Sequence, residues 1–154
     1  MGTMEGCAGL IDEVLSAGDQ RAAARAIAQR HREQKLPLPG FGHPFHKPDD
    51  PRTPKLFEVA REAGVDGKHI AALELLSAEI DDVYGRHLTI NATGAIAALL
   101  GEITVPSRIA RGIAVISRAA GLVAHIAEEQ RHPAMKTMWE SAEAAVPYEA
   151  QSVD

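Results

Sequence analysis

The sequence predicts an all-α protein, and three observations carry that prediction. Apolar residues make up 45% of the 154 residues and aromatic residues only 4%, a balance that favours closely packed, alanine-rich helices. Apolar side chains recur at helical spacing through most of the chain, as in helices that are buried on one face. No segment alternates apolar and polar residues as a half-buried strand would, and no internal repeat is present.

Two helices are predicted at the start of the chain. The first covers residues 5–17, where apolar residues have helical spacing, and Gly18 ends it. Asp19 can cap the second helix, which covers residues 19–34 and has a weakly apolar face. The apolar stripe over residues 5–34 is expected to need packing partners from outside the chain.

Residues 36–54 are predicted to form an irregular loop. Six of the nine prolines fall in this segment, and proline removes a backbone donor and fixes φ. A loop so rich in polar groups is a candidate binding or catalytic loop, although the same composition fits a connector whose charges face water. Its ionisable side chains are those of His43, His46, Lys47, Asp49, Asp50 and Arg52.

Five further helices are predicted after the loop, and the first four lie between residues 53 and 130. Thr53-Pro54 begins one of them, because proline suits the first helical position, and Leu56, Phe57, Val59 and Ala60 are expected to form its buried face. A longer helix over residues 67–85 ends at Gly85, and a short extended link leads to the next. The others cover residues 93–103, capped by Asn91 or Thr93, and residues 107–130.

A last amphipathic helix follows His132-Pro133 and carries Met135, Met138 and Trp139. The tail from Pro147 is expected to fray. Gly112 and Gly121 are expected to mark close helix contacts, since glycine inside a helix costs ~1 kcal/mol relative to alanine. The apolar stripe over residues 107–130 is also expected to need a partner.

Composition excludes several classes of protein. The net charge of −5 and the absence of a basic cluster argue against nucleic-acid and membrane-surface partners. The single cysteine, Cys7, excludes an internal disulfide and a cysteine-based zinc site, and no metal site is predicted. No unbroken apolar run is long enough for a transmembrane helix and no secretory signal is visible, so a cytoplasmic location is expected.

Three motifs stand in a fixed order along the chain. The first is P-G-F-G-H-P-x-x-K-x-x-D-P-R at residues 39–52, the second is the helix start led by Asn91, and the third is S-R-x-x-G-x-x-A-H-I-x-E at residues 117–128. Together they resemble the C-terminal half of citrate synthases and the related citryl-CoA lyases, from about Met4 to about Gln130. The resemblance implies an all-α small domain plus part of a large domain, and a dimer. The first half of a usual family member is expected to be missing.

The resemblance also implies roles for individual residues. His43 matches the histidine that hydrogen-bonds the ketone oxygen of oxaloacetate, and Arg52 and Arg118 match arginines that bind its carboxylates. Lys47 matches a cation placed against a coenzyme A phosphate, and the backbone of Gly40, Phe41 and Gly42 matches the loop that lines the adenine.

The chemistry of these side chains suits the implied roles. Arginine can bind a carboxylate through two parallel hydrogen bonds, and an imidazole can donate to a developing oxyanion. Alternatives stay open, because His43 could bond only to a loop carbonyl and Arg52 could simply follow the turn at Asp50-Pro51. Arg118 could pair with a helix carboxylate, and His125 and Glu128 of the third motif are interpreted as structural.

Two departures from the family pattern concern the removal of a proton from acetyl-CoA. The family's aspartate base usually lies two residues after an asparagine, and here Thr93 stands in that place. A threonine hydroxyl cannot act as a base near neutral pH. The family's second histidine corresponds to Met4, whose thioether has no hydrogen to donate to an enolate. Glu5 is a competing candidate for the base.

The first interpretation is an enzyme that makes or breaks a carbon–carbon bond between an acyl-CoA and a keto-dicarboxylate such as oxaloacetate. Coenzyme A thioester would be a co-substrate, with no tightly bound cofactor. The alternative is a truncated or non-catalytic family fragment that acts as a binding or assembly module. Either way, a homo-oligomer or a partner that supplies the missing half is expected. The predicted division is residues 1–34 at the domain junction, 35–106 in the small domain and 107–154 in helices of the large-domain type.

Overall fold

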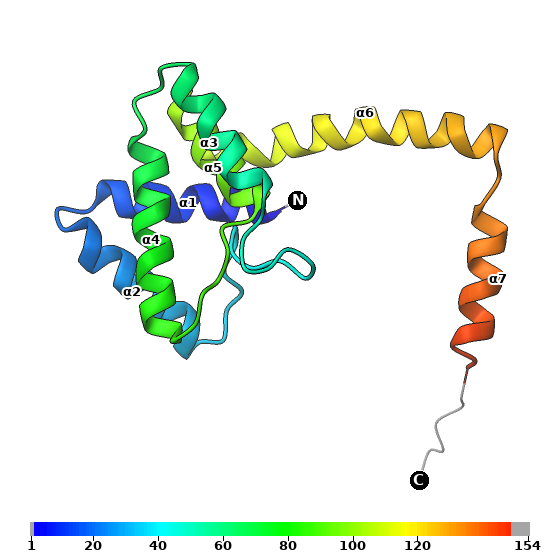
Figure 1. Cartoon of the computed structure of the whole chain (residues 1–154), viewed down its shortest axis with the longest axis horizontal. Helices are drawn as coiled ribbons and strands as arrows, with labels where there is room; N and C mark the ends of the chain where they lie inside the picture. Colours follow the sequence, from blue (N-terminus) through cyan, green and yellow to red (C-terminus); the bar gives the residue numbers. More distant parts are fainter. Residues whose placement is uncertain (1, 149–154) are drawn as a thin grey trace, which may run out of the picture. The chain divides into compact units, whose positions relative to one another are not determined.

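A computed structural model describes residues 2–148, and the ordered elements within this range are helices. They are α1 (Gly2–Ser16), α2 (Gln20–Glu33), α3 (Arg52–Glu62), α4 (Lys68–Tyr84), α5 (Ala92–Glu102), the short 3-10 helix η1 (Ser107–Ile109), α6 (Ala110–Arg131) and α7 (Met135–Ala145) (Figure 1). The predicted all-α class is confirmed, and every predicted helix is present. Beyond Tyr148 the predicted fraying of the tail lies outside the described residues.

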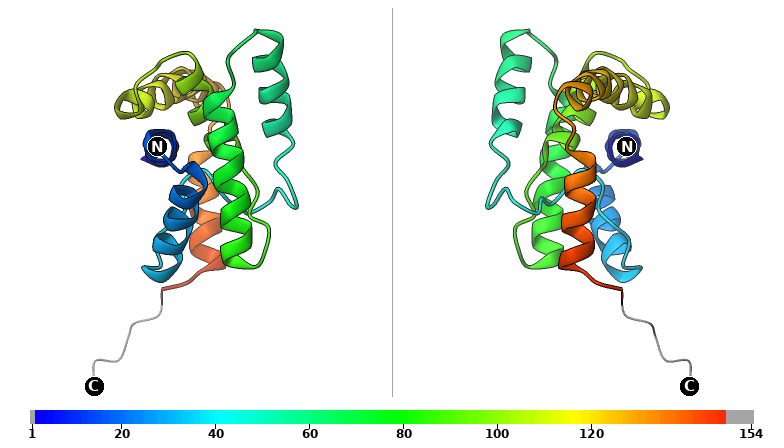
Figure 2. Two further views of the ribbon diagram at one scale, coloured as in Figure 1. Left: turned by 90° about the vertical axis from the view of Figure 1, so that its left-hand side faces the viewer. Right: turned by 90° about the vertical axis from the view of Figure 1, so that its right-hand side faces the viewer.

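The chain divides into two compact units, Met1–Val115 and Ile116–Asp154. In the first unit, α1 packs on α2, α4 and α5, and α2 lies along α4 (Figure 2). The expectation that residues 5–34 need outside partners is wrong, because the apolar faces of both α1 and α2 are buried within this unit. The largest fully buried apolar side chains of this core are Ile11, Val14, Ile27, Leu73, Leu76 and Ile80.

The ends of α2, α4 and α5 follow the predicted capping chemistry. Helix α3 does not, because it begins at Arg52, directly after Pro51, so residues 52–54 of the predicted loop are helical. The Asp19 side chain accepts a hydrogen bond from the Ala22 N–H, at 3.0 Å, and Asn91 accepts one from the Gly94 N–H, at 3.1 Å. Gly85 ends α4 in the left-handed conformation, with φ 66°. At the start of α4, where Gly67 has no side chain, the Glu102 carboxylate accepts from three backbone N–H groups. Burial opposes its charge, but these donors outweigh burial and lower the pKa of Glu102.

Helix α3 buries a narrower face than predicted. Phe57 and Ala60 are buried and Leu56 is half-buried, but Val59 is 52% exposed. The prediction for Val59 is therefore wrong. The reason is that α3 packs mainly on α5, so only one side of the helix is covered.

The loop between α2 and α3 rests on α1 and α5 through very small residues. Gly40 has φ 89°, and a Cβ built on it would lie 2.4 Å from Cys7 Sγ and 3.0 Å from Gly94 Cα. A Cβ on Gly94 would lie 2.5 Å from the Gly40 carbonyl oxygen. Burial raises the pKa of the Cys7 thiol to about 12, so this group serves packing. The three residues Cys7, Gly40 and Gly94 thus set how closely the loop approaches the two helices.

Helices α6 and α7 expose much of their apolar surface in this chain. The predicted need of residues 107–130 for a partner is consistent with this exposure. Gly112 and Gly121 have open space around them within the chain, so the close contacts expected there are not made by the described residues. The exposed apolar residues are Ile109, Ile113, Val115, Ile116, Leu122, Val123, Ile126, Met135, Met138 and Trp139.

The stretch Ser107–Arg131 is 25 residues long and apolar enough to cross a membrane by length and composition. This stretch is not an unbroken apolar run, because Arg111 and Arg118 interrupt it, so the expectation that no such run exists holds. One helix of this kind is weak grounds for a membrane span, since a helix that packs on protein has the same composition. The predicted division into residues 1–34, 35–106 and 107–154 stays a prediction.

Candidate functional site

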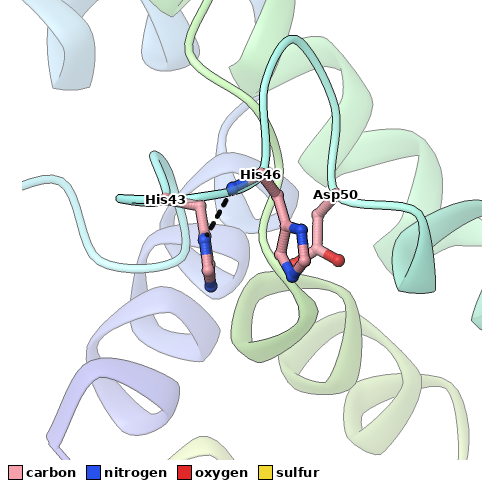
Figure 3. A group of neighbouring side chains, drawn as sticks. All are labelled: His43, His46 and Asp50. Carbon is pink, nitrogen blue, oxygen red and sulfur yellow. Dashed lines mark hydrogen bonds between the residues drawn. The ribbon is translucent and has the colours of Figure 1, made fainter.

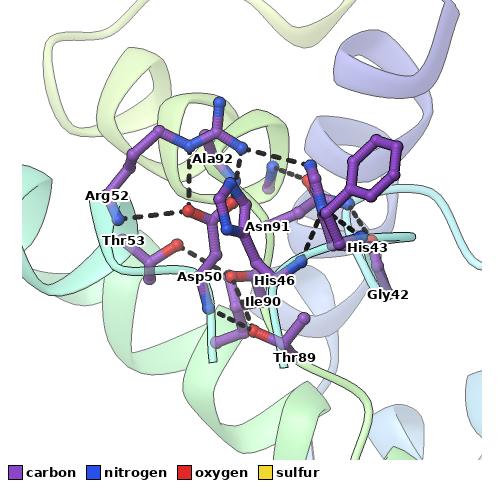
Figure 4. Close-up of polar contacts among 12 residues, drawn as sticks. Gly42, His43, His46, Asp50, Arg52, Thr53, Thr89, Ile90, Asn91 and Ala92 are labelled. Carbon is purple, nitrogen blue, oxygen red and sulfur yellow. Dashed lines mark hydrogen bonds and ion pairs between the residues drawn. The ribbon is translucent and has the colours of Figure 1, made fainter. Parts of the chain in front are cut away.

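The candidate site is built where the loop meets the link between α4 and α5. The Gly42 N–H donates to the Thr89 carbonyl at 2.8 Å, and the Asn91 N–H donates to the Gly40 carbonyl at 3.0 Å. Phe41 and Ile90 form an isolated antiparallel bridge, and Asn91 Nδ2 donates to the Gly42 carbonyl at 2.9 Å. These bonds place the loop against the start of α5 (Figure 4).

Asp50 is the centre of the polar network. Its side chain is fully buried, and one oxygen accepts from Arg52 Nε at 2.8 Å and from the Arg52 N–H at 3.1 Å. The other accepts from Arg52 Nη2 at 2.7 Å and from the Ala92 N–H, at the start of α5, at 2.9 Å. The Arg52 guanidinium, with help from these N–H groups, holds the pKa of Asp50 well below its usual range. Asp50 therefore stays ionised and fixes the plane of the guanidinium.

His43 presents one ring nitrogen to the loop and the other to Arg52. Its Nδ1 accepts hydrogen bonds from the N–H groups of Phe45, at 3.1 Å, and His46, at 3.0 Å. Because Nδ1 accepts, the neutral ring carries its hydrogen on Nε2. His43 Nε2 lies 3.4 Å from Arg52 Nη2. Both groups are donors in this tautomer, so together they offer a place for an acceptor oxygen.

His43, His46 and Asp50 lie close enough to be considered as metal ligands. One ligand atom from each falls within 4.8 Å of the others, and the two imidazole centroids are 4.2 Å apart (Figure 3). Both Asp50 oxygens already accept hydrogen bonds from a guanidinium or a backbone N–H. A metal ion here would also stand beside the positive charge of Arg52, which disfavours it. We assign no metal to this group.

A pocket of about 300 Å³, lined in part by His43 and His46, adjoins the site. Lys47 and Arg86 both line it, so two cations face the same space. His87 lies there too, with Nε2 3.1 Å from an Asp49 oxygen and Nδ1 2.5 Å from an Asp81 oxygen. The Asp81 carboxylate, followed by that of Asp49, raises the pKa of His87. His87 thus ties the loop to the end of α4.

The remaining predicted residues lie on helices around the loop. Thr93 is half-buried in the first turn of α5, directly after the Ala92 N–H that binds Asp50. Glu5 lies in the first turn of α1 and forms an ion pair with Arg111, at 2.9 Å. Arg118 is exposed on α6 in the second unit, and its predicted role in binding a carboxylate of the substrate stays a prediction. Met4 is buried on α1.

Sequence reasoning missed the positioning groups of the site. It named Asp50 only as part of the loop and gave no role to Thr89, whose hydroxyl accepts from the Asp50 N–H at 2.9 Å. The Asp-Pro-Arg spacing could have indicated the Asp50–Arg52 pair, since side chains two apart around a proline turn can meet. The hydrogen bonds between Asp50 and residues 89–92 could not be predicted from the local sequence, because their partners lie 39–42 positions apart along the chain.

Comparisons with known proteins agree with the motifs. The family described as "Citrate synthase, C-terminal domain" matches residues 1–138. Proteins named "Putative citrate synthase 2" in Mycobacterium bovis and Mycobacterium tuberculosis are 29% identical over 126 residues, which is 79% of this chain and 32% of theirs. The structure of citryl-CoA lyase from Hydrogenobacter thermophilus matches with a TM-score of 0.75 and 30% identity, over 99% of this chain and 59% of that one. The chain therefore spans about a third of the curated relatives and just over half of the solved one.

Proposed function

This chain belongs to the citrate synthase family, and from that membership we propose that it binds a keto-dicarboxylate such as oxaloacetate and acts on it with an acyl-CoA. The reaction class is the making or breaking of a carbon–carbon bond between the two. Arg52 would bind a carboxylate of the oxo acid, and His43 would donate to its ketone oxygen.

The observation that carries this proposal is the fixed pair of Arg52 and His43. Asp50 holds Nε and Nη2 of the guanidinium, and Nη1 has no protein partner among residues 2–148. An exposed guanidinium edge held in one plane is suited to a carboxylate. The donor on His43 Nε2 lies 3.4 Å from Arg52 Nη2. A carboxylate and a ketone on neighbouring carbon atoms fit donors at this spacing.

A coenzyme A thioester would bind next to this pair as co-substrate, with no tightly bound cofactor. Lys47 and Arg86 line one pocket beside His43, and two cations suit the phosphates of coenzyme A. The backbone of Gly40, Phe41 and Gly42 would line the adenine, and its bonds to Thr89 and Asn91 keep that backbone in place. Arg118 would supply the second carboxylate contact.

The proton-removing half of the site differs from the family pattern. Thr93 occupies the place of the base, and Met4 occupies the place of the enolate donor and is buried. Glu5 carries a carboxylate nearby in sequence, but that carboxylate pairs with Arg111. We therefore expect this chain to enolise acetyl-CoA very slowly.

Deuterium exchange tests this expectation. Acetyl-CoA is incubated with the chain and oxaloacetate in heavy water, and loss of methyl protons is followed by NMR. The parent chain should exchange slowly, and Thr93→Asp with Met4→His should exchange faster, because a carboxylate at the start of α5 stays ionised. Release of the coenzyme A thiol in the same samples reports carbon–carbon bond formation.

Two results would redirect the proposal. Fast exchange by the parent chain shows that a base is present, and loss of that exchange in Glu5→Gln identifies it. If neither the parent chain nor the double variant exchanges the methyl protons, the second candidate function is favoured, which is a binding or assembly module. The absence of a carboxylate at Thr93 favours that candidate. The module would act with a second copy of the chain or with a different partner chain.

A further inference from the structure

An apolar groove of about 840 Å³ runs between α3 and α5. Leu56 and Val59 line it from α3, and Ile96, Leu99 and Ile103 line it from α5 and its end. Val59 is 52% and Ile103 60% exposed, so large apolar side chains face solvent there. Exposed apolar surface of this extent is unfavourable unless a ligand or a partner covers it.

The groove is continuous with the candidate site. Arg52 and Ala92 both line its end, and the same two residues hold the Asp50 carboxylate through their nitrogen atoms. Among the described residues that line the groove, Arg52 and Lys55 are the charged ones, and both are cationic. A ligand that fills the groove would therefore have an apolar body and a negative end at Arg52.

The dimensions and the donors narrow the choice of ligand. The volume lies within the range of ~300–1,000 Å³ that is typical of small-molecule pockets. His43 does not line the groove, but its Nε2 lies 3.4 Å from Arg52 Nη2, so a ketone oxygen next to a carboxylate on Arg52 would also find a donor. A 2-oxo acid has these two groups on neighbouring carbon atoms.

We propose that the groove binds the hydrocarbon chain of an amphipathic 2-oxo acid whose carboxylate lies on Arg52 and whose ketone lies on His43. The groove thus favours a 2-oxo acid in which an apolar substituent replaces the second carboxylate of the keto-dicarboxylate proposed above, while the contacts to Arg52 and His43 stay the same. The head-group contacts rest on the proposed function, whereas the chain contacts rest on the groove alone.

The test is a titration of the full chain with straight-chain 2-oxo acids of four to ten carbons, with oxaloacetate as the reference. Each methylene that enters the groove should tighten binding about fourfold, since its burial favours binding by ~0.8 kcal/mol. Val59→Trp should remove most of this gain, because the indole fills the groove. Glu62→Trp is the matched control, since Glu62 is exposed on the same helix and does not line the groove. Arg52→Ala should weaken the binding of every oxo acid in the series by a similar factor.

The outcomes separate the groove from the head-group site. An affinity that does not change with chain length, while oxaloacetate still binds, overturns the groove proposal and leaves the proposed function standing. A second result would overturn both the groove proposal and the proposed function. In it, affinity rises with the length of the oxo acid, oxaloacetate does not bind and Arg52→Ala has no effect, so the groove binds apolar chains of any kind. If Val59→Trp changes the mass measured by light scattering and the chain-length gain is absent, the occupant is a second copy of the chain and the proposal is wrong.

Discussion

Asp50 shows how this site keeps a buried charge. A carboxylate removed from water is costly unless hydrogen bonds replace its hydration. Here the Arg52 guanidinium and two backbone N–H groups supply those bonds. The residue that the substrate would meet is Arg52, and Asp50 acts through it as a positioning residue.

Replacing Asp50 by Asn should destabilise the protein by roughly 2 kcal/mol, because hydrogen bonds to a charged group are lost in a buried place. Urea unfolding followed by circular dichroism at neutral pH measures this. The pKa of Asp50 is lowered on folding, so its contribution is complete above about pH 4 and declines below that value. A difference between the two proteins that grows on acidification would contradict the assignment.

The pKa of His87 is raised on folding, so its contribution has the opposite dependence on pH. The imidazolium between Asp49 and Asp81 should stabilise the fold fully below about pH 6.5, and this stabilisation should be lost as the pH rises through the higher folded value. The difference in unfolding free energy between the parent and His87→Gln should therefore be larger at pH 6 than at pH 9. His132→Gln, at an exposed histidine, is the control. An equal difference at both pH values would show that His87 acts by packing alone.

At the residue scale, the sequence indicated which side chains belong to the loop but not how they are oriented. His43 and Arg52 stood out because their residue types suit an oxo acid. The acceptor role of His43 Nδ1 could not be predicted, since it depends on the backbone path through Phe45 and His46. The functional roles of all the predicted site residues stay predictions. These residues are Glu5, Gly40, Phe41, Gly42, His43, Lys47, Arg52, Thr93 and Arg118.

At the scale of elements, the loop depends on small residues in two helices. Gly94 in α5 lies under the Gly40 carbonyl, where no Cβ would fit without movement of the backbone. This contact explains why glycine stands in the first turn of α5, although glycine lowers helix stability.

Gly94→Ala should destabilise the protein by roughly 1–3 kcal/mol, because the added methyl group meets backbone atoms that cannot move freely. Gly9→Ala is the matched control, since Gly9 is exposed within α1 and has open space around it. That variant should be more stable than the parent by up to ~1 kcal/mol. Thermal unfolding of both variants measures the contrast. A Gly94→Ala protein as stable as the parent would mean that the loop moves easily on α5.

The helices themselves were well predicted because their signals are local. Asp19, Asn91 and Gly85 act at helix ends in the way that their side chains or backbone conformations favour. Val59 was misassigned because helical spacing shows that a face is apolar but not what covers it. The groove between α3 and α5 follows from that same uncovered face.

At the scale of the whole molecule, the exposed apolar residues of α6 and α7 favour association. Val123 is 68% and Ile126 59% exposed, and such residues are usually covered in a stable protein. The apolar stripe over residues 107–130 could be predicted from the sequence. The partner that covers this stripe could not be predicted, because the chain spans only part of the length of its relatives.

We expect the parent chain to form a homodimer or a larger assembly at tens of micromolar. Light scattering should give a mass above the 16.4 kDa of one chain. Replacing Val123 and Ile126 by Glu should lower that mass, whereas Glu143→Gln on the same unit should not. A soluble parent protein with the mass of a single chain would contradict this prediction.

The central claim is that this member of the citrate synthase family holds an oxo acid through the guanidinium that Asp50 fixes. Isothermal titration with oxaloacetate, on the parent chain, Arg52→Ala and the control Arg61→Ala, tests it most directly. We predict that Arg52→Ala weakens binding by roughly 1.5–3 kcal/mol, or about 10- to 150-fold, because a charge-assisted pair is lost. Arg61→Ala, at an exposed arginine of the same helix, should bind as the parent does. Equal binding of oxaloacetate by Arg52→Ala and the parent would contradict the claim.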